Sequence, residues 1–229
     1  MQQKLKQLYQ RQFDSWKSSK VLVANESKLS APFLSSIPEP YANSKLKLVI
    51  IGQQTDSWGT ERGKKRANWV KVDSTEAVDE LTKEHSSYYQ NPVARRRPFF
   101  KAANSIAKQL GFMPRSWVWA NLSLFDINGQ APRDEVRQAV GGSNLLRKIL
   151  EILQPDAVVL FTNHRNDEYL CDGTLPETTA IGDLPPKVAA RIILPGFPAK
   201  TFRTSHPRWL IRGRWHVLTV ISEQIAISA

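Results

Sequence analysis

The side chains best able to do chemistry follow the apolar start of residues 47–59. The apolar run stops at Gly52 and turns polar with Gln53, Gln54 and Asp56. A run without alternation is typical of a parallel strand covered on both faces. The loop after the carboxyl end of such a strand is where open parallel sheets bind ligands. These amides and this carboxylate could therefore bind a polar ligand and orient a water molecule.

Two further polar side chains follow apolar segments later in the chain. Asn121 lies in the apolar segment 117–123, and His206 lies in the polar segment 204–210. If both segments end at the carboxyl edge of one parallel sheet, an amide, a carboxylate and an imidazole can meet in one pocket. Each also has a simpler interpretation, because Asn121 could form a turn, Asp56 could cap the next segment and His206 could be an ordinary loop residue.

Four apolar segments predict the strands that position these side chains. Segments of adequate length for helices separate them, which predicts a parallel α/β sheet covered on both faces. We therefore expect one domain over residues 1–229, built as a three-layer sandwich with a four-stranded parallel sheet between helices. The predicted strands are residues 47–52, 117–123, 157–162 and 191–195.

Apolar spacing and capping residues predict the helices. Asp73 or Ser74 could cap one helix and Gly111 could end another. A Ser- and Pro-rich connection at 27–41 is too interrupted for a helix interior, and a polar insertion at 163–187 is long enough to be either functional or mobile. The predicted helices cover residues 1–18, 73–90, 99–110, 145–153 and 209–227.

The charge of the chain favours a polyanionic partner. Its 32 Lys and Arg residues exceed its 21 Asp and Glu residues, giving a net charge of +11, and nucleic acid is the commonest partner of such proteins. A basic loop at residues 60–69 lies between Trp58 and Trp69. Basic residues interleaved with aromatics are typical of nucleic-acid contact, although a solvated loop would look the same. The candidate DNA-binding residues of this loop are Lys64, Lys65 and Arg66.

The single cysteine, Cys171, excludes a disulfide within the chain, a four-cysteine zinc site and an iron–sulfur cluster bound by cysteines. No run of eighteen apolar residues is present, so we expect a cytoplasmic protein that does not enter a membrane. His164, Asp167 and Glu168 fit the start of a helix better than a metal site. We expect no metal and no cofactor.

The order of these motifs resembles the uracil-DNA glycosylase superfamily. Gly52-Gln53-Gln54 follows a buried strand, an asparagine ends the next strand, and His206-Pro207 precedes Leu210 by the family's spacing. The likeness covers most of the chain. It implies a four-stranded parallel sheet between helices and a monomeric, metal-independent enzyme that binds DNA and extrudes a pyrimidine before cleaving its glycosidic bond.

The resemblance also implies roles for individual residues. His206 would stabilise negative charge on the leaving base, and Asn121 would hydrogen-bond the Watson–Crick edge of the extruded base. Leu210 would fill the gap in the duplex, with Ser205 and Arg208 at the flanking phosphates. Gln53 would lie in the pocket floor. The aromatic side chain that stacks on the base is left open between Trp58, Trp69 and Phe125.

The opening loop departs from the family. Well-known members carry Gly-Gln-Asp-Pro-Tyr, in which the aspartate orients water and the tyrosine blocks substituents at C5 of the pyrimidine. Here Gln54, Thr55 and Asp56 follow Gln53, so either Gln54 or Asp56 would orient the water. Without the tyrosine the pocket could admit a C5-modified cytosine, hydroxymethylated or glucosylated, as in phage DNA. That substrate would make the protein a bacterial defence enzyme.

Three alternatives stay open from the sequence. The protein could be a conventional uracil-DNA glycosylase of base-excision repair. It could be a catalytically silent nucleic-acid-binding module, because no aspartate stands at position 54. It could also hydrolyse free nucleosides or nucleotides.

Overall fold

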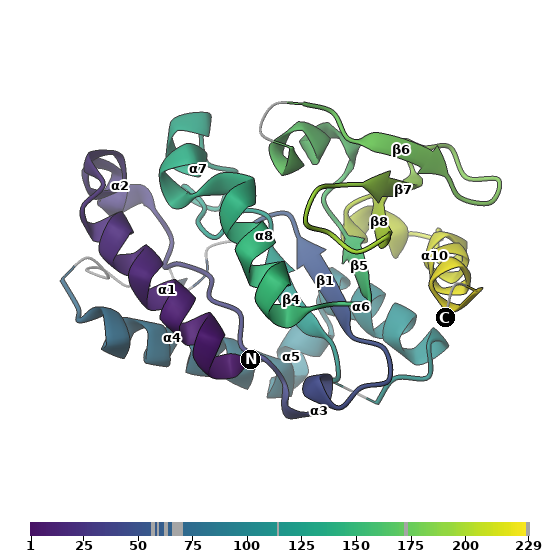
Figure 1. The fold of residues 1–229 in the computed structure, drawn as a ribbon, viewed down its shortest axis with the longest axis horizontal. Coiled ribbons are helices and arrows are strands. Elements are labelled where there is room, and N and C mark those ends of the chain that lie inside the picture. The colour runs from purple at the N-terminus through teal and green to yellow at the C-terminus, as the bar shows by residue number, and fades with distance from the viewer. Residues whose placement is uncertain are drawn as a thin grey trace.

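The chain folds as one α/β domain around a six-stranded mixed sheet. The computed structural model describes residues 1–55, 58, 60–61, 64–65, 71–113, 115–171 and 174–227. The sheet runs in the order β4-β1-β5-β8-β7-β6, which can be followed in Figure 1. Its strands are β1 (Leu48–Gly52), β4 (Val118–Asn121), β5 (Ala157–Leu160), β6 (Glu177–Ala180), β7 (Ala189–Ile193) and β8 (Lys200–Thr204); β2 (Thr60–Glu61) and β3 (Lys64–Lys65) form a separate two-stranded ribbon.

Four neighbouring strands of the sheet, β4, β1, β5 and β8, are parallel. The predicted parallel α/β core is therefore confirmed, but the predicted strand number and fourth strand are wrong. Residues 191–195 overlap β7, which pairs antiparallel with β8. The fourth parallel strand is β8, which contains the buried charged side chain of Arg203 and so lacks an apolar run. β6 pairs antiparallel with β7 and completes the sheet.

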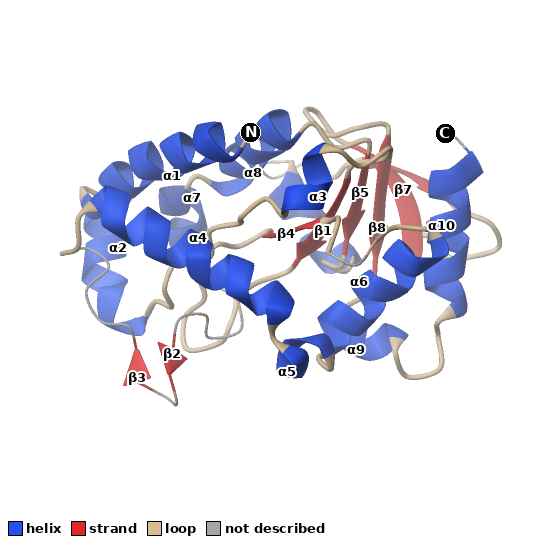
Figure 2. Cartoon of the chain, turned by 90° about the horizontal axis from the view of Figure 1, so that it is seen from below, coloured by secondary structure: helices blue, strands red, loops and turns tan. Residues whose placement is uncertain are grey.

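Helices cover both faces of the sheet. Figure 2 shows α1 and α8 on one side and α6, α9 and α10 on the other. The parallel strands β1, β4 and β5 are buried along their whole length between these layers. The helices are α1 (Gln2–Lys17), α2 (Lys20–Asn25), α3 (Glu39–Ala42), α4 (Ser74–Gln90), α5 (Pro92–Arg95), α6 (Pro98–Gln109), α7 (Asp134–Val140), α8 (Gly142–Leu153), α9 (Pro207–Leu210) and α10 (His216–Ile227), with 3-10 turns η1 (Glu26–Lys28) and η2 (His164–Leu170).

Local signals set several of these boundaries. Asp73 caps α4, because its carboxylate accepts the backbone N–H groups of Thr75 and Glu76. Gly111 follows α6 with a φ of +71°, a conformation that favours glycine. The predicted helix 209–227 is wrong as one element, since Gly213, with a φ of +87°, separates α9 from α10.

The two predicted connections contain short regular elements. The Ser- and Pro-rich segment 27–41 includes the end of η1 and the start of α3. The insertion 163–187 includes η2 and the edge strand β6. Much of this insertion therefore belongs to the framework, where η2 follows the carboxyl end of β5.

Side chains of α4 cover the edge strand β4. The backbone N–H of Trp119 donates to the Tyr89 hydroxyl at 2.5 Å, and Nε2 of His85 lies 3.2 Å from the Trp119 carbonyl oxygen. Nδ1 of His85 accepts the backbone N–H of Ser36 at 3.0 Å, so the hydrogen belongs on Nε2. Burial lowers the pKa of His85 to about 3. His85 is therefore a neutral histidine that links Ser36 to Trp119.

Candidate active site

The carboxyl ends of the four parallel strands meet at one edge of the sheet. Gly52 of β1 lies beside Asn121 of β4 in the strand register, and β5 and β8 continue the same parallel array. Asn121, Gln53 and His206 therefore share this edge, as the sequence predicts. From β4 to β8 there are three strand spacings, or about 14 Å between backbones. Two side chains and a pyrimidine ring between them can span that width.

Asn121 presents an unused hydrogen-bond donor at this edge. The residue is 2 % exposed. Its Oδ1 accepts the indole N–H of Trp119 at 3.2 Å, which orients the carboxamide. Its Nδ2 is buried and has no hydrogen-bond partner among the residues that the structure describes. An unsatisfied buried donor costs about 1–3 kcal/mol, so this site is suited to a ligand that offers an acceptor.

Gly52 is required by the position of Asn121. A Cβ atom added to Gly52 would lie 2.4 Å from Oδ1 of Asn121 and 3.3 Å from the Phe99 ring. The carboxamide thus rests directly on the backbone at the end of β1. The glycine of the predicted opening loop acts here as a steric gap that admits the asparagine side chain.

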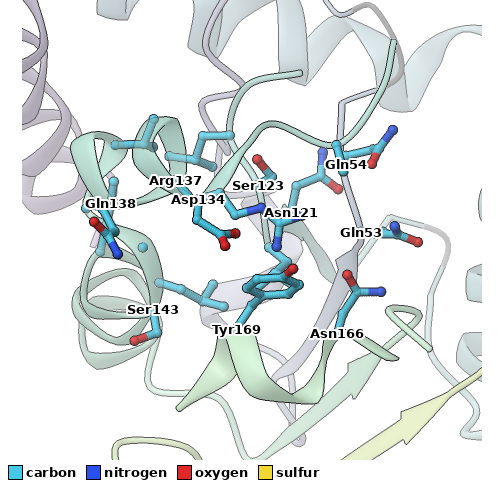
Figure 3. A pocket seen from close by; sticks show the side chains of 18 of the residues that line it. Gln53, Gln54, Asn121, Ser123, Asp134, Arg137, Gln138, Ser143, Asn166 and Tyr169 are labelled. Carbon is cyan, nitrogen blue, oxygen red and sulfur yellow. The ribbon is translucent and has the colours of Figure 1, made fainter. Parts of the chain in front are cut away.

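A cavity of about 480 Å³ opens beside Asn121. Gln53, Gln54 and Ser123 line it near the strand ends, and polar residues of α7, α8 and η2 line the opposite side, as Figure 3 shows. The guanidinium carbon of Arg137 lies 3.6 Å from the centre of the Tyr169 ring. The polar residues contributed by those three elements are Asp134, Arg137, Gln138, Ser143, Asn166, Glu168 and Tyr169.

The loop after β1 is held by a buried carboxylate that the sequence analysis missed. The Thr55 hydroxyl donates to the carboxylate of Asp126, whose Oδ1 also accepts the Gly129 N–H at 2.6 Å. Nε2 of Gln54 donates to the Gly129 carbonyl at 2.8 Å. This anchor leaves the carboxamide oxygen of Gln54 as an acceptor that can orient water.

Five predicted site residues fall partly or wholly outside the described chain. Asp56, Arg66 and Trp69 are not among the described residues, and neither are the side chains of Lys64 and Lys65. The choice between Gln54 and Asp56 as the group that orients water therefore stays open, and so does the predicted DNA contact of the basic loop.

The end of β5 carries two polar groups that the sequence analysis did not assign to the site. Oγ1 of Thr162 and Nδ1 of His164 are buried without a hydrogen-bond partner in the described part of the chain. Between them, Asn163 has a φ of +66° and a ψ of 149°, a region that is strained for any residue except glycine. The strain and the unpaired groups lie between the strands that carry Asn121 and His206. The sequence signal that could have identified these two groups is the polar segment that directly follows the apolar strand.

A buried ion pair ties η2 to β8. Nε and Nη2 of Arg203 each lie 3.1 Å from a carboxylate oxygen of Asp167, and Nη1 donates to the Pro186 carbonyl at 2.7 Å. Burial raises the pKa of Asp167 more strongly than the nearby Arg203 guanidinium lowers it. Asp167 is thus a positioning group for η2, which carries Asn166 and Tyr169 to the cavity.

His206 lies just beyond the end of β8 and is exposed. It caps α9, because its Nδ1 accepts the backbone N–H of Arg208 at 3.3 Å. In that tautomer Nε2 carries the hydrogen and can donate it to a ligand. Ser205 beside it is 9 % exposed. Among the described residues, His206 lies outside the set that lines the cavity, so the structure brings Gln53, Gln54 and Asn121 together at the cavity but does not include His206.

Three predicted contacts are not available at the surface. Leu210 and Phe125 are 0 % exposed, and Phe125 packs edge-on against Trp16 with the ring centres 5.0 Å apart. Trp58 is 5 % exposed and packs against Phe33. The predictions that Leu210 fills a duplex gap and that Phe125 stacks on a base are wrong for this structure, because both side chains belong to the core. Tyr169 is the aromatic side chain that lines the cavity.

No protein-family model matches this chain, and no curated protein shows a similar sequence. In the described part of the chain, no helix is both long and apolar enough to cross a membrane.

Proposed function

We propose that this protein is a DNA glycosylase of the uracil-DNA glycosylase type that removes an extruded pyrimidine and leaves an abasic site. The observation that carries the proposal is the carboxamide of Asn121. Trp119 fixes its oxygen, and its Nδ2 is a buried donor with no partner among the described residues. Such a donor suits the ring nitrogen or carbonyl acceptors on the Watson–Crick edge of a pyrimidine.

The chemistry assigned to the site is hydrolysis of the N-glycosidic bond. The C1′–N1 bond breaks and its electron pair passes to the base, which leaves positive charge on the sugar. The Nε2 hydrogen of His206 faces the negative charge on the base. Water, oriented by Gln54 or Asp56, adds to C1′ and releases a proton that neutralises the base. A donor placed where charge develops contributes the largest single part of such catalysis.

The cavity supports a substrate larger than uracil. Its volume of about 480 Å³ lies within the range of about 300–1,000 Å³ that is usual for small-molecule sites, which leaves room for a substituent beside a pyrimidine ring. The wall opposite Asn121 carries the polar side chains of Asp134, Gln138 and Ser143 among apolar ones. Polar groups placed to bind hydroxyls disfavour a substrate that lacks them. A C5-modified cytosine, hydroxymethylated or glucosylated, fits this arrangement and implies defence against phage DNA.

Mass spectrometry of released bases tests the proposal. Purified protein is incubated with phage DNA containing glucosylated hydroxymethylcytosine, with hydroxymethylcytosine DNA and with uracil DNA, and abasic sites are counted by alkaline strand cleavage. We expect release of the modified cytosine and loss of that release in Asn121→Ala. Efficient release of uracil alone would support conventional repair instead.

A catalytically silent binding module is the second candidate. It is favoured by the side chain of Gln54, which replaces an acidic residue and is anchored to Gly129. Tight DNA binding without release of any base, in the same experiment, would identify this function.

A further inference from the structure

The turn that follows β8 presents a basic and aromatic surface. Residues 205–216 contain three arginines, two histidines and no acidic residue. Arg208 and Arg212 are exposed, Trp209 is 36 % exposed and Trp215 is 39 % exposed. Basic side chains interleaved with aromatic rings are the combination that grips phosphates and stacks on bases.

Trp209 is held at the surface by its neighbours. The guanidinium carbon of Arg214 lies 4.1 Å from the centre of the Trp209 ring, a cation–π contact that restrains the indole. The next residue, Leu210, is 0 % exposed and fastens α9 to the core. The backbone N–H of Trp209 donates to the His206 carbonyl at 2.9 Å. Trp209 therefore projects from a fixed turn, one helical turn from His206.

We infer that the substrate is duplex DNA and that Trp209, rather than Leu210, enters the base stack when the target nucleotide is extruded. The inference rests on the proposed function. Extrusion from a duplex costs stacking and pairing energy, and proteins that open duplexes insert apolar side chains into the gap. An indole can stack on the exposed neighbouring base and so offset part of that cost. Arg208 and Arg212 contact the flanking phosphates.

The inference distinguishes Trp209 from its neighbour Leu210. Leu210 can reach a base only if α9 leaves the core, whereas Trp209 can do so from its present position. A single strand has no gap to fill. The contribution of Trp209 should therefore appear with a duplex and disappear with a single strand of the same sequence.

The test compares excision rates on these two substrates under single-turnover conditions. We expect Trp209→Ala to lower the duplex rate at least tenfold and to leave the single-strand rate close to that of the unchanged protein. Trp209→Phe should recover most of the duplex rate. Ile193→Ala is the control, since it removes an exposed apolar side chain from β7, outside this surface. An equal loss on both substrates, or no loss on the duplex, would overturn the inference.

A second measurement separates this inference from the proposed function. A duplex carrying 2-aminopurine beside the target base reports unstacking by fluorescence, whether or not any base is released. We expect the unchanged protein to raise the fluorescence and Trp209→Ala to fail to do so at saturating protein. If the protein releases no base yet shows this difference, the glycosylase function fails and duplex insertion stands. If the fluorescence rise is the same in both proteins, duplex insertion by Trp209 fails.

Discussion

His85 and His206 border the same sheet, but the two histidines lie in different environments. His85 is fully buried, and both of its nitrogens have partners. His206 is exposed just beyond the end of β8, and its Nδ1 accepts the Arg208 N–H. The comparison indicates that the α4 side of the sheet serves stability. The carboxyl edge, where Asn121 and His164 carry unpaired nitrogens within the described chain, holds polar groups suited to a ligand.

The largest effect should come from removing the exposed histidine. We expect His206→Ala to lower the single-turnover excision rate by about a hundredfold or more, the loss that follows removal of a donor at developing negative charge. DNA affinity should stay near that of the unchanged protein, and thermal stability should fall slightly because the Arg208 N–H loses its cap. His216→Ala removes another exposed histidine of the same segment and is the control. A rate unaffected by His206→Ala would exclude this residue from the mechanism.

Replacing the buried histidine should lower stability and leave the excision rate unchanged. His85→Phe leaves the Ser36 N–H and the Trp119 carbonyl without their partner, and each loss costs about 1–3 kcal/mol. We expect urea denaturation at pH 7 to show a lower free energy of unfolding, while the folded protein keeps its excision rate. A large rate loss with unchanged stability would reverse the roles that the comparison assigns.

The pH dependence of stability sharpens the same comparison. Because burial lowers the pKa of His85 from 6.5 to about 3, protonation favours the unfolded chain. The stabilising contribution is complete above pH 6.5 and is lost as pH falls toward 3, by up to about 1.4 kcal/mol per pH unit. Urea midpoints measured from pH 7 to pH 4 should show this slope in the unchanged protein and a smaller slope in His85→Phe.

The smallest effect is expected from adding one methyl group to Gly52, at the end of β1. In Gly52→Ala the new Cβ would lie 2.4 Å from Oδ1 of Asn121, so the carboxamide must move. We expect the excision rate to fall about tenfold, as misplacement of a binding group does. Gly111→Ala is the control: nothing lies within 4 Å of the added atom, although the φ of +71° there is unfavourable to alanine. Equal rates in the two variants would show that the position of Asn121 does not matter.

The buried apolar strands and the polar residues that follow them could be predicted from sequence. Leu48–Gly52 is buried at every position, and Asn121 ends its strand as expected. β8 escaped prediction because Arg203 is buried against Asp167, and a pattern of apolar residues cannot reveal a buried ion pair. Leu210 was misjudged for a related reason. Spacing from His206 places it on the turn, but only the packing of α9 shows which side of the turn faces the core.

The contacts between α4 and β4 also bear on which edge of the sheet can pair with another copy of this protein. Tyr89 and His85 are hydrogen-bonded to the backbone N–H and carbonyl of Trp119. These groups, in the middle of the edge strand β4, are therefore not open to pairing with a strand of another molecule. At the opposite margin, all four residues of β6 are exposed, from Glu177 to Ala180. A second sheet could be joined to this one through β6, at the opposite edge of the sheet from β4 and Asn121.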